Sequence, residues 1–253
     1  MLATLTDTPF SDPDWIYERK FDGERCLGLR DGAEVRLLSR SGQALTATYP
    51  EAADVLARQP CRDFLVDGEV VAFEGTRTSF ARLQQRMGVT DEDQARTSRI
   101  AIAYYVFDLL RLDGRDLTGL PLRTRKALLR RALTYTSPLR FATHRNSTGE
   151  AYLDQACERG WEGLIAKQAD SGYVSRRSAD WLKFKCGNRG ACGRRLHRTG
   201  GPACRIRCPA GRLLRRPAPD VRGKGRHRLR RANSDGLAQA AGCPGARRPA
   251  VRR

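Results

Sequence analysis

A sharp change in composition near residue 186 limits what this chain can fold into. From Cys186 to Arg253 the sequence has no phenylalanine, tyrosine, tryptophan or glutamate, and arginine, glycine, proline, alanine and cysteine dominate. Such a segment cannot bury enough apolar surface to offset the conformational entropy that ordering removes. We therefore predict a folded domain over residues 1–189 and a disordered basic tail over residues 190–253.

The net charge of +19 lies almost entirely in that tail. Residues 186–253 hold 19 lysines and arginines against two acids, so their net charge is +17. The first 185 residues hold the other 28 basic and 26 acidic groups, a net of +2. Arginine-rich arms commonly bind nucleic acid, so a non-catalytic arginine-rich nucleic-acid-binding protein is one interpretation of the chain.

The sequence gives no support to three other classes of protein. It has no stretch of 18 apolar residues, and its N-terminal residues lack the basic and apolar regions of a signal peptide. Eight cysteines without a secretory signal predict reduced thiols rather than a disulfide framework. The cysteines from Cys186 onward form no C-x2-C pair, and no histidine lies at finger-like spacing, so we expect no zinc site.

Residues 15–185 have the patterning of an α+β domain. Stretches rich in β-branched, aromatic or alternating apolar residues predict strands at Trp15–Phe21, Cys26–Arg30, Glu34–Ser39, Phe64–Phe73 and Ile100–Leu110. Helical spacing predicts helices at Pro50–Arg58, Ser79–Met87, Leu122–Leu133 and Thr148–Arg159, the last ended by Gly160. Short strands in meanders mixed with helices favour mainly antiparallel sheets with flanking helices over alternating βαβ units.

The segment from Lys20 to Arg25 reads K-x-D-G-x-R and indicates a nucleophilic lysine. An attacking amine must be deprotonated, and a free lysine has a pKa of about 10.4. Burial and neighbouring cations lower that pKa, and Arg25 is one such cation that can also bind a phosphate. Asp22-Gly23 predicts a tight turn that holds both side chains toward one pocket. The alternative is a solvated, charged strand end.

Four later segments carry further candidate residues, three of them with a structural alternative. Asp67-Gly68-Glu69 could bind a ribose hydroxyl or a metal, and Phe107 before Asp108 could stack on a base. A turn acid and a core aromatic are the alternatives. Glu162-Gly-Leu-Ile-Ala-Lys167 puts a carboxylate and an ammonium at the two ends of an apolar strand. In Trp181-Leu-Lys-Phe-Lys185 the two lysines share one strand face, which suits a triphosphate or simply solvent.

The ordered set K-x-D-G-x-R, D-G-E, F-D, E-G-L-I-x-K and W-L-K-F-K resembles the covalent nucleotidyltransferase family. Within that family it is similar to ATP-dependent DNA ligases of the bacterial end-joining type, over about residues 1–189. RNA ligases and capping enzymes share the lysine motif and are the second enzymatic interpretation. Glu162 at the start of the fourth segment and the W-L-K-F-K strand look more like a DNA ligase.

The resemblance implies a role for each matching residue. Lys20 would attack the α-phosphate of ATP, and Lys183 and Lys185 would neutralise the charge that develops there. The other implied contacts are Glu18 with the adenine edge, Phe107 with the base, Glu69 with the ribose, Arg25 and Arg40 with ribose, phosphate or the 5′-phosphate of a nick, Glu162 with Mg2+ (or Mn2+), and Lys167, Arg177 and Trp181 with the rest of the pocket.

The resemblance also implies a substrate and a setting. The AMP would pass from Lys20 to a 5′-phosphate in nicked or broken double-stranded DNA, and a 3′-hydroxyl would then displace it. We expect a monomer in the bacterial cytoplasm, associated with the nucleoid and with no membrane contact, in company with end-joining repair proteins.

Ligases of this type continue into an OB-fold domain, but the tail has none of the alternating apolar strands that a small β barrel needs. Codons allowed for Val221–Asp235, read from the second base, permit the string Y-A-G-K-V-G-T-G-F-D-E-R-T-L, which is similar to OB-domain sequence. The same offset over Gly190–Leu214 permits another such string. We therefore hypothesise a frameshift near Arg189–Gly190, and we expect the missing OB domain to impair ligation.

Overall fold

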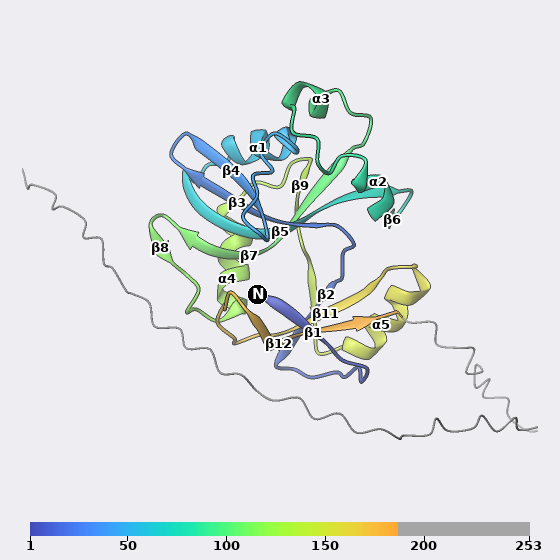
Figure 1. The fold of residues 1–253 in the computed structure, drawn as a ribbon. Coiled ribbons are helices and arrows are strands. Elements are labelled where there is room, and N and C mark those ends of the chain that lie inside the picture. The colour runs from blue at the N-terminus through green and yellow to red at the C-terminus, as the bar shows by residue number, and fades with distance from the viewer. Residues whose placement is uncertain (187–253) are drawn as a thin grey trace, which may run out of the picture. The chain divides into compact units, whose positions relative to one another are not determined.

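The computed structural model describes residues 1–186, and all structural statements below concern that part of the chain (Figure 1). Within it the predicted α+β class is confirmed: two mainly antiparallel sheets are flanked by helices. The prediction of a disordered tail over residues 190–253, and the frameshift hypothesis, lie outside the described residues.

The larger sheet has seven strands, with the order β4-β3-β5-β7-β8, β6 paired to β5 and β9 paired to β7. Its strands are β3 (Glu24–Asp31), β4 (Glu34–Ser39), β5 (Asp63–Glu74), β6 (Arg77–Thr78), β7 (Ile102–Leu112), β8 (Arg115–Asp116) and β9 (Leu139–Phe141). Only the β7–β9 pair is parallel. The hairpin between β3 and β4 turns at residues 32 and 33, because Asp31 pairs with Glu34.

The smaller sheet has five strands in the order β1-β12-β11-β2-β10. They are β1 (Leu2–Leu5), β2 (Trp15–Arg19), β10 (His144–Asn146), β11 (Gly163–Gln168) and β12 (Arg177–Lys185). Only the β1–β12 pair is parallel. Strand β2 ends one residue before Lys20, so that lysine lies just beyond a strand rather than inside one.

Five helices accompany the sheets: α1 (Pro50–Ala57), α2 (Phe80–Gln84), α3 (Glu92–Arg96), α4 (Leu122–Ala132) and α5 (Gly149–Glu158). Side chains of α1 and α4 join the main hydrophobic core of the larger sheet, whereas α5 packs in a separate apolar cluster against β2, β11 and β12. The predicted end of α5 is confirmed, because Gly160 has φ of 67° just past the helix.

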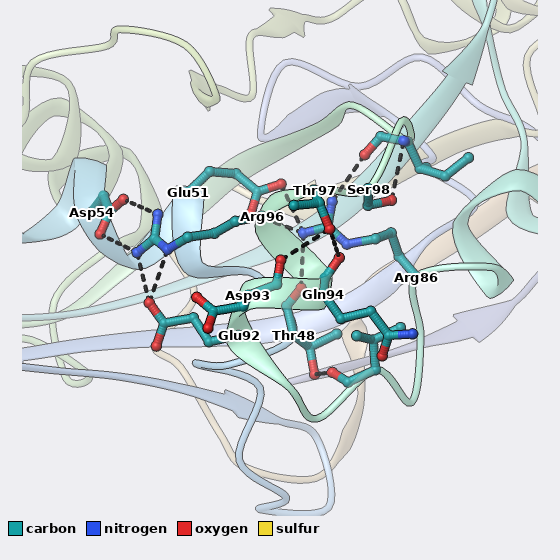
Figure 2. A network of polar contacts seen from close by, with 12 residues as sticks. Thr48, Glu51, Asp54, Arg86, Glu92, Asp93, Gln94, Arg96, Thr97 and Ser98 are labelled. Atoms are coloured by element: carbon teal, nitrogen blue, oxygen red, sulfur yellow. Dashed lines mark hydrogen bonds and ion pairs between the residues drawn. The ribbon is translucent and has the colours of Figure 1, made fainter.

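A network of ion pairs and hydrogen bonds joins α1 to the segment that carries α2 and α3 (Figure 2). Arg86 is buried, and its guanidinium donates to both carboxylate oxygens of Glu51 and to the carbonyls of Thr48 and Ile100. Arg96, on α3, bonds to Asp54 on α1 and to Glu92 one turn earlier. We call Glu51, Asp54, Arg86, Glu92 and Arg96 the α1–α3 network.

The prediction of reduced thiols is wrong for one pair of cysteines. Cys157 near the end of α5 and Cys186 directly after β12 form a disulfide, with 5.3 Å between their Cα atoms. Both belong to the apolar cluster beneath the smaller sheet, which brings them within bridging range although 29 residues separate them. Cys26 and Cys61 are free, and the other four cysteines lie outside the described residues.

No helix within residues 1–186 has the length and apolar character needed to cross a membrane.

Candidate active site

A cavity of about 140 Å³ lies between residues of the two sheets. Its wall includes seven of the residues that the sequence marked as candidates: Glu18, Lys20, Arg25, Glu69, Phe107, Lys167 and Trp181. Ala3, Arg19, Phe21 and Ile165 complete it. The candidates are spread over more than 160 residues of sequence, so the fold rather than local spacing brings them together.

Lys20 reaches this cavity from the turn that follows β2. Its backbone N–H donates to the carbonyl of Gly163 at 2.9 Å, which fixes the turn against the start of β11. Gly163 has φ of 147°, and a Cβ there would lie 1.9 Å from the carbonyl oxygen of Phe184, so only glycine fits. The Lys20 ammonium donates a hydrogen bond to the Glu162 carboxylate, the residue that the sequence assigned to a metal.

Gly23 lets the turn after Lys20 pack directly on β5. A Cβ at this position would lie 2.2 Å from the carbonyl oxygen of Val70, so no other residue fits without a shift of the backbone. The chain then enters β3, where Arg25 pairs with Glu69 across the two strands. The predicted turn thus brings Lys20 and Arg25 to one cavity.

Arg25 already has a carboxylate partner within the protein. Its Nε and Nη2 donate to the two oxygens of the buried Asp67, and the hydroxyl of Tyr173 donates to the same carboxylate at 2.8 Å. Burial alone would lower the pKa of Arg25, but Asp67 reverses that effect and raises it. The guanidinium carbon also lies 4.7 Å from the ring centre of Phe107. The predicted contact of Arg25 with ribose or phosphate remains a prediction.

The floor of the cavity is a buried carboxylate between two ammonium groups. Lys126 Nζ lies 2.6 Å from one oxygen of Glu18, and Lys167 Nζ lies 2.7 Å from the other. Burial would raise the pKa of Glu18, but the two lysines lower it overall. Burial lowers the pKa of Lys167 to about 8, with Glu18 opposing that shift. These three groups, which we call the cavity floor, carry one surplus positive charge when all are ionised.

Sequence reasoning missed Lys126, which lies on α4. Its ammonium also donates to the carbonyls of Phe107 and Ala142, so it joins β2, β7 and the segment before β10. A signal was present in the sequence, because the buried face of α4 is formed by residues 122, 125, 126 and 129. Two of the four, Arg125 and Lys126, are cations on an apolar face, and buried cations need partners. Arg125 finds its partner in Asp108, at 2.8 Å.

Two aromatic rings stand beside the floor. The rings of Phe107 and Trp181 meet edge to face at 5.9 Å, and Lys167 Nζ lies 4.2 Å and 4.0 Å from their centres. The indole N–H of Trp181 is buried and has no hydrogen-bond partner among the described residues. An unpaired buried donor in a cavity wall costs stability unless a ligand or water accepts from it.

Glu69 contributes a carboxyl group to the cavity wall from β5. Burial raises its pKa to about 7, although Arg25 and Lys20 oppose the shift. Near neutral pH this side chain therefore exists in both its protonated and its ionised form.

Besides Glu162, four sequence candidates lie outside the cavity wall. Arg40 is exposed and lines an adjoining groove of about 420 Å³ that shares Arg25 and Glu69 with the cavity wall. Lys183 and Lys185 alternate with Phe184 on β12 and so share the strand face of Trp181, as predicted. Arg177, at the start of β12, is exposed and donates to the carbonyl of Ala3 at 2.6 Å.

Residues 1–185 match a protein family described as "ATP dependent DNA ligase domain". Among curated relatives, the multifunctional non-homologous end joining protein LigD of Pseudomonas aeruginosa is 36% identical over 188 residues, which are 73% of this chain and 21% of that protein. LigD of Mycobacterium tuberculosis is 36% identical over 190 residues, 73% of this chain and 23% of that protein. The chain thus spans about a fifth of the length of these relatives.

Solved structures give the same picture. A mycobacterial DNA ligase D complexed with ATP and MES superposes with a TM-score of 0.61 at 32% identity, covering 73% of this chain and 58% of that structure. The ligase domain of M. tuberculosis LigD superposes with a TM-score of 0.58, also at 32% identity, covering 60% of that structure.

Proposed function

Because the chain belongs to the ATP-dependent DNA ligase family, and its described residues correspond to the adenylation domain, we propose that Lys20 is its nucleophile toward ATP. The observation that carries this proposal is the position of Lys20, which lies at the cavity wall and is hydrogen-bonded to Glu162. An amine so placed can attack a phosphate held in the cavity, provided it first loses its proton.

We propose that the cavity holds the adenosine part of ATP. Phe107 and Ile165 offer apolar surface to the base, and the unpaired indole N–H of Trp181 offers a hydrogen-bond donor. Glu69 is the candidate partner for the ribose hydroxyls. The cavity floor, with Glu18 held by both lysines, carries surplus positive charge toward the ligand.

The chemical step would be an in-line displacement at the α-phosphorus. The nitrogen of Lys20 gives up its proton to water and forms a bond to phosphorus, and the hydrogen bond to Glu162 positions the amine. The bond from phosphorus to the bridging oxygen of pyrophosphate breaks, and pyrophosphate leaves. Lys183 and Lys185, on the face of β12 next to Trp181, would offset the negative charge of the transition state.

A divalent metal would be held by Glu162 together with Asp22. Asp22 follows Lys20 by two residues, and the ammonium of Lys20 is hydrogen-bonded to Glu162. Burial raises the pKa of Asp22, and the charge of Glu162 raises it further. Within residues 1–186 no three His, Cys, Asp or Glu side chains converge on one point. Mg2+ needs no more than one or two protein carboxylates when substrate phosphates supply other ligands, so this pair fits Mg2+ or Mn2+. When bound, the metal would screen the phosphate charges.

We further propose that nicked double-stranded DNA receives the AMP, and that Arg40 in the adjoining groove contacts its 5′-phosphate. Transfer to the 5′-phosphate and displacement by the 3′-hydroxyl would follow. Two relatives are named as end-joining proteins, which supports end-joining repair proteins as partners. Because the sequence from residue 190 onward lacks the alternating apolar strands of an OB-fold domain, we expect weak or reversible adenylylation of Lys20 and little sealing by this chain.

Labelling with ATP that carries radioactive α-phosphate tests the proposal. We expect an acid-sensitive protein–AMP adduct with ATP and not with GTP, lost in Lys20→Ala and retained in Lys224→Ala, a matched lysine change outside the described residues. Labelling that persists in Lys20→Ala would show that another residue is the nucleophile. Preference for GTP would favour the capping-type alternative, and robust sealing of nicked DNA would overturn the expected impairment.

A further inference from the structure

Four arginines from four segments gather around two aromatic rings beside the cavity. The guanidinium carbons of Arg19 and Arg159 lie 4.6 Å and 5.4 Å from the ring centre of Trp161. Arg145 lies 4.3 Å from the ring centre of Tyr152, and the two rings meet edge to face at 6.0 Å. These residues and Arg77, described next, form what we call the arginine–aromatic surface.

Arg77 reaches this surface from the β5–β6 hairpin of the larger sheet. A Cβ at Gly160 would lie 2.5 Å from the guanidinium carbon of Arg77, so the arginine rests directly on that glycine. Gly160 also has the positive φ that ends α5, and it precedes Trp161. The glycine therefore serves two purposes: it ends the helix, and it leaves room for a fourth cation next to Trp161.

These arginines lack the carboxylate partners that other arginines of the domain have. None of the ion pairs within residues 1–186 involves Arg19, Arg77, Arg145 or Arg159. Arg145 donates only to the neutral side chain of Gln155, at 2.9 Å. Aromatic faces attract cations but do not neutralise them, so the surface keeps its positive charge.

The exposure of the side chains indicates what kind of anion fits. Arg77, Arg145 and Arg159 are exposed, whereas Tyr152 is buried and Trp161 is half-buried beneath the guanidinium groups. The rings thus support the arginines and are not free to stack on unpaired bases, as a single-strand binding surface would require. Exposed guanidinium forks without exposed rings suit the phosphates of a duplex backbone.

The surface starts at the proposed nucleophile. Arg19 directly precedes Lys20, Trp161 directly precedes Glu162, and Arg19 also lines the cavity. A polyanion that presents one phosphate at the cavity therefore meets Arg19, which Trp161 connects to the rest of the surface. We propose that the arginine–aromatic surface binds the sugar-phosphate backbone of duplex DNA next to the nick, an inference that rests on the proposed DNA ligase function.

Binding of nicked duplex at several salt concentrations tests this proposal in the full chain. The test variant is the triple change Arg77→Ala, Arg145→Ala and Arg159→Ala, which spares Arg19 because it lines the cavity. The charge-matched control removes three exposed arginines elsewhere, Arg58, Arg62 and Arg131. Each lost phosphate contact should lower the salt slope by about 0.9, so we expect a drop of about 2.7 in the test variant.

The salt slope of the control variant should decrease by less than half of that amount. Both variants should form the Lys20–AMP adduct as the unchanged chain does. Equal decreases of the salt slope in the two variants would mean that only the total charge matters. An unchanged salt slope in the test variant would show that the surface does not bind DNA. If the unchanged chain formed no adduct, that would count against the proposed function. The DNA-binding measurements would still test the arginine–aromatic surface.

Chemical modification of arginine side chains, mapped by mass spectrometry, reads each residue separately despite the many arginines beyond residue 186. We expect nicked duplex to protect Arg77, Arg145 and Arg159 from a glyoxal reagent and to leave Arg58, Arg62 and Arg131 reactive. Protection by a polyaspartate peptide but not by duplex DNA would assign the surface to an acidic protein and overturn the proposal.

Discussion

The α1–α3 network and the cavity floor each contain a buried cation paired with a carboxylate, yet the two pairings differ. In the network, the two terminal nitrogens of the buried Arg86 donate to both oxygens of Glu51 and to two backbone carbonyls, while its Nε has no partner among the described residues (Figure 2). In the floor, Lys126 and Lys167 share the single carboxylate of Glu18. Arg86 is thus matched by a carboxylate of its own, whereas the second region retains a positive charge at the wall of a cavity.

The difference distinguishes buried charges that only stabilise the fold from buried charges that can also bind a ligand. A cation matched by carboxylates and carbonyls contributes to stability and offers nothing to a substrate. Two ammonium groups on one carboxylate cost desolvation free energy that an anionic ligand can recover. Variants of equivalent residues in the two regions can therefore separate loss of stability from loss of function.

Replacing the carboxylate in each region should give the largest contrast. Glu18→Gln leaves two buried ammonium groups without a counter-charge, so we expect the free energy of unfolding to fall by about 3–5 kcal/mol. Glu51→Gln keeps a hydrogen-bond acceptor beside Arg86 at a half-exposed position, and a loss of about 1 kcal/mol is expected. Urea denaturation of the two variants measures both values. Equal losses would contradict the distinction between the regions.

Replacing the buried cation in each region should reduce stability in both but function in only one. Arg86→Met leaves two backbone carbonyls without donors, and Lys126→Met leaves one oxygen of Glu18 bonded to nothing, so each should cost about 2–4 kcal/mol. Per folded molecule, Lys126→Met should slow formation of the AMP adduct about tenfold, which corresponds to a rise of about 1.4 kcal/mol in the activation free energy. Arg86→Met should leave that rate unchanged. The measurement is the rate of AMP-adduct formation in each variant, divided by the folded fraction from circular dichroism.

Between pH 4.5 and 7 the pH dependence of stability should come mainly from Glu69 in the cavity, because Asp54 in the network has a lowered pKa and titrates at more acid pH. The folded-state pKa of Glu69 is raised to about 7 by burial, above the unfolded value of 4.5, so the native state binds the extra proton in between. Stability from this group is full below pH 4.5 and is lost as the pH rises through about 7, by about 3 kcal/mol. In Glu69→Gln the free energy of unfolding should vary less with pH over this range. A slope that persists in this variant would point to another group.

The smallest effect is expected at the exposed end of the α1–α3 network. Arg96 and both of its carboxylate partners, Asp54 and Glu92, are well exposed to solvent. Solvent and salt screen such pairs, so Arg96→Ala should leave the midpoint of thermal unfolding nearly unchanged and the labelling rate intact. A large drop in the midpoint would show that the network acts as one unit with Arg86.

The sequence predicted the class of fold and most of the cavity wall. The strands of the larger sheet carry strong alternating patterns, and the glycine of the D-G turn correctly indicated that Lys20 and Arg25 face one cavity. Elements of two to five residues, such as β6 and α3, were missed because they are too short for periodicity to register. Helix α2 (Phe80–Gln84) is shorter than the helix predicted at Ser79–Met87, since apolar spacing does not mark where a short helix ends.

The pairing of charges could not be predicted, because it depends on long-range contacts. Arg25 and Asp67 are 42 residues apart, and Lys20 and Glu162 are 142 apart. Local spacing says which groups exist but not which ones meet. The disulfide between Cys157 and Cys186 was missed for the same reason, since only the packing of α5 under the smaller sheet brings them together.

Locating the AMP on the protein tests the central claim most directly. The full chain would be incubated with ATP and Mg2+, digested, and analysed by tandem mass spectrometry. We predict a single AMP on the peptide that contains Lys20, at that residue. AMP attached instead to Lys183, Lys185 or any other residue, or the absence of an adduct from protein that demonstrably binds ATP, would contradict the assignment of Lys20 as the nucleophile.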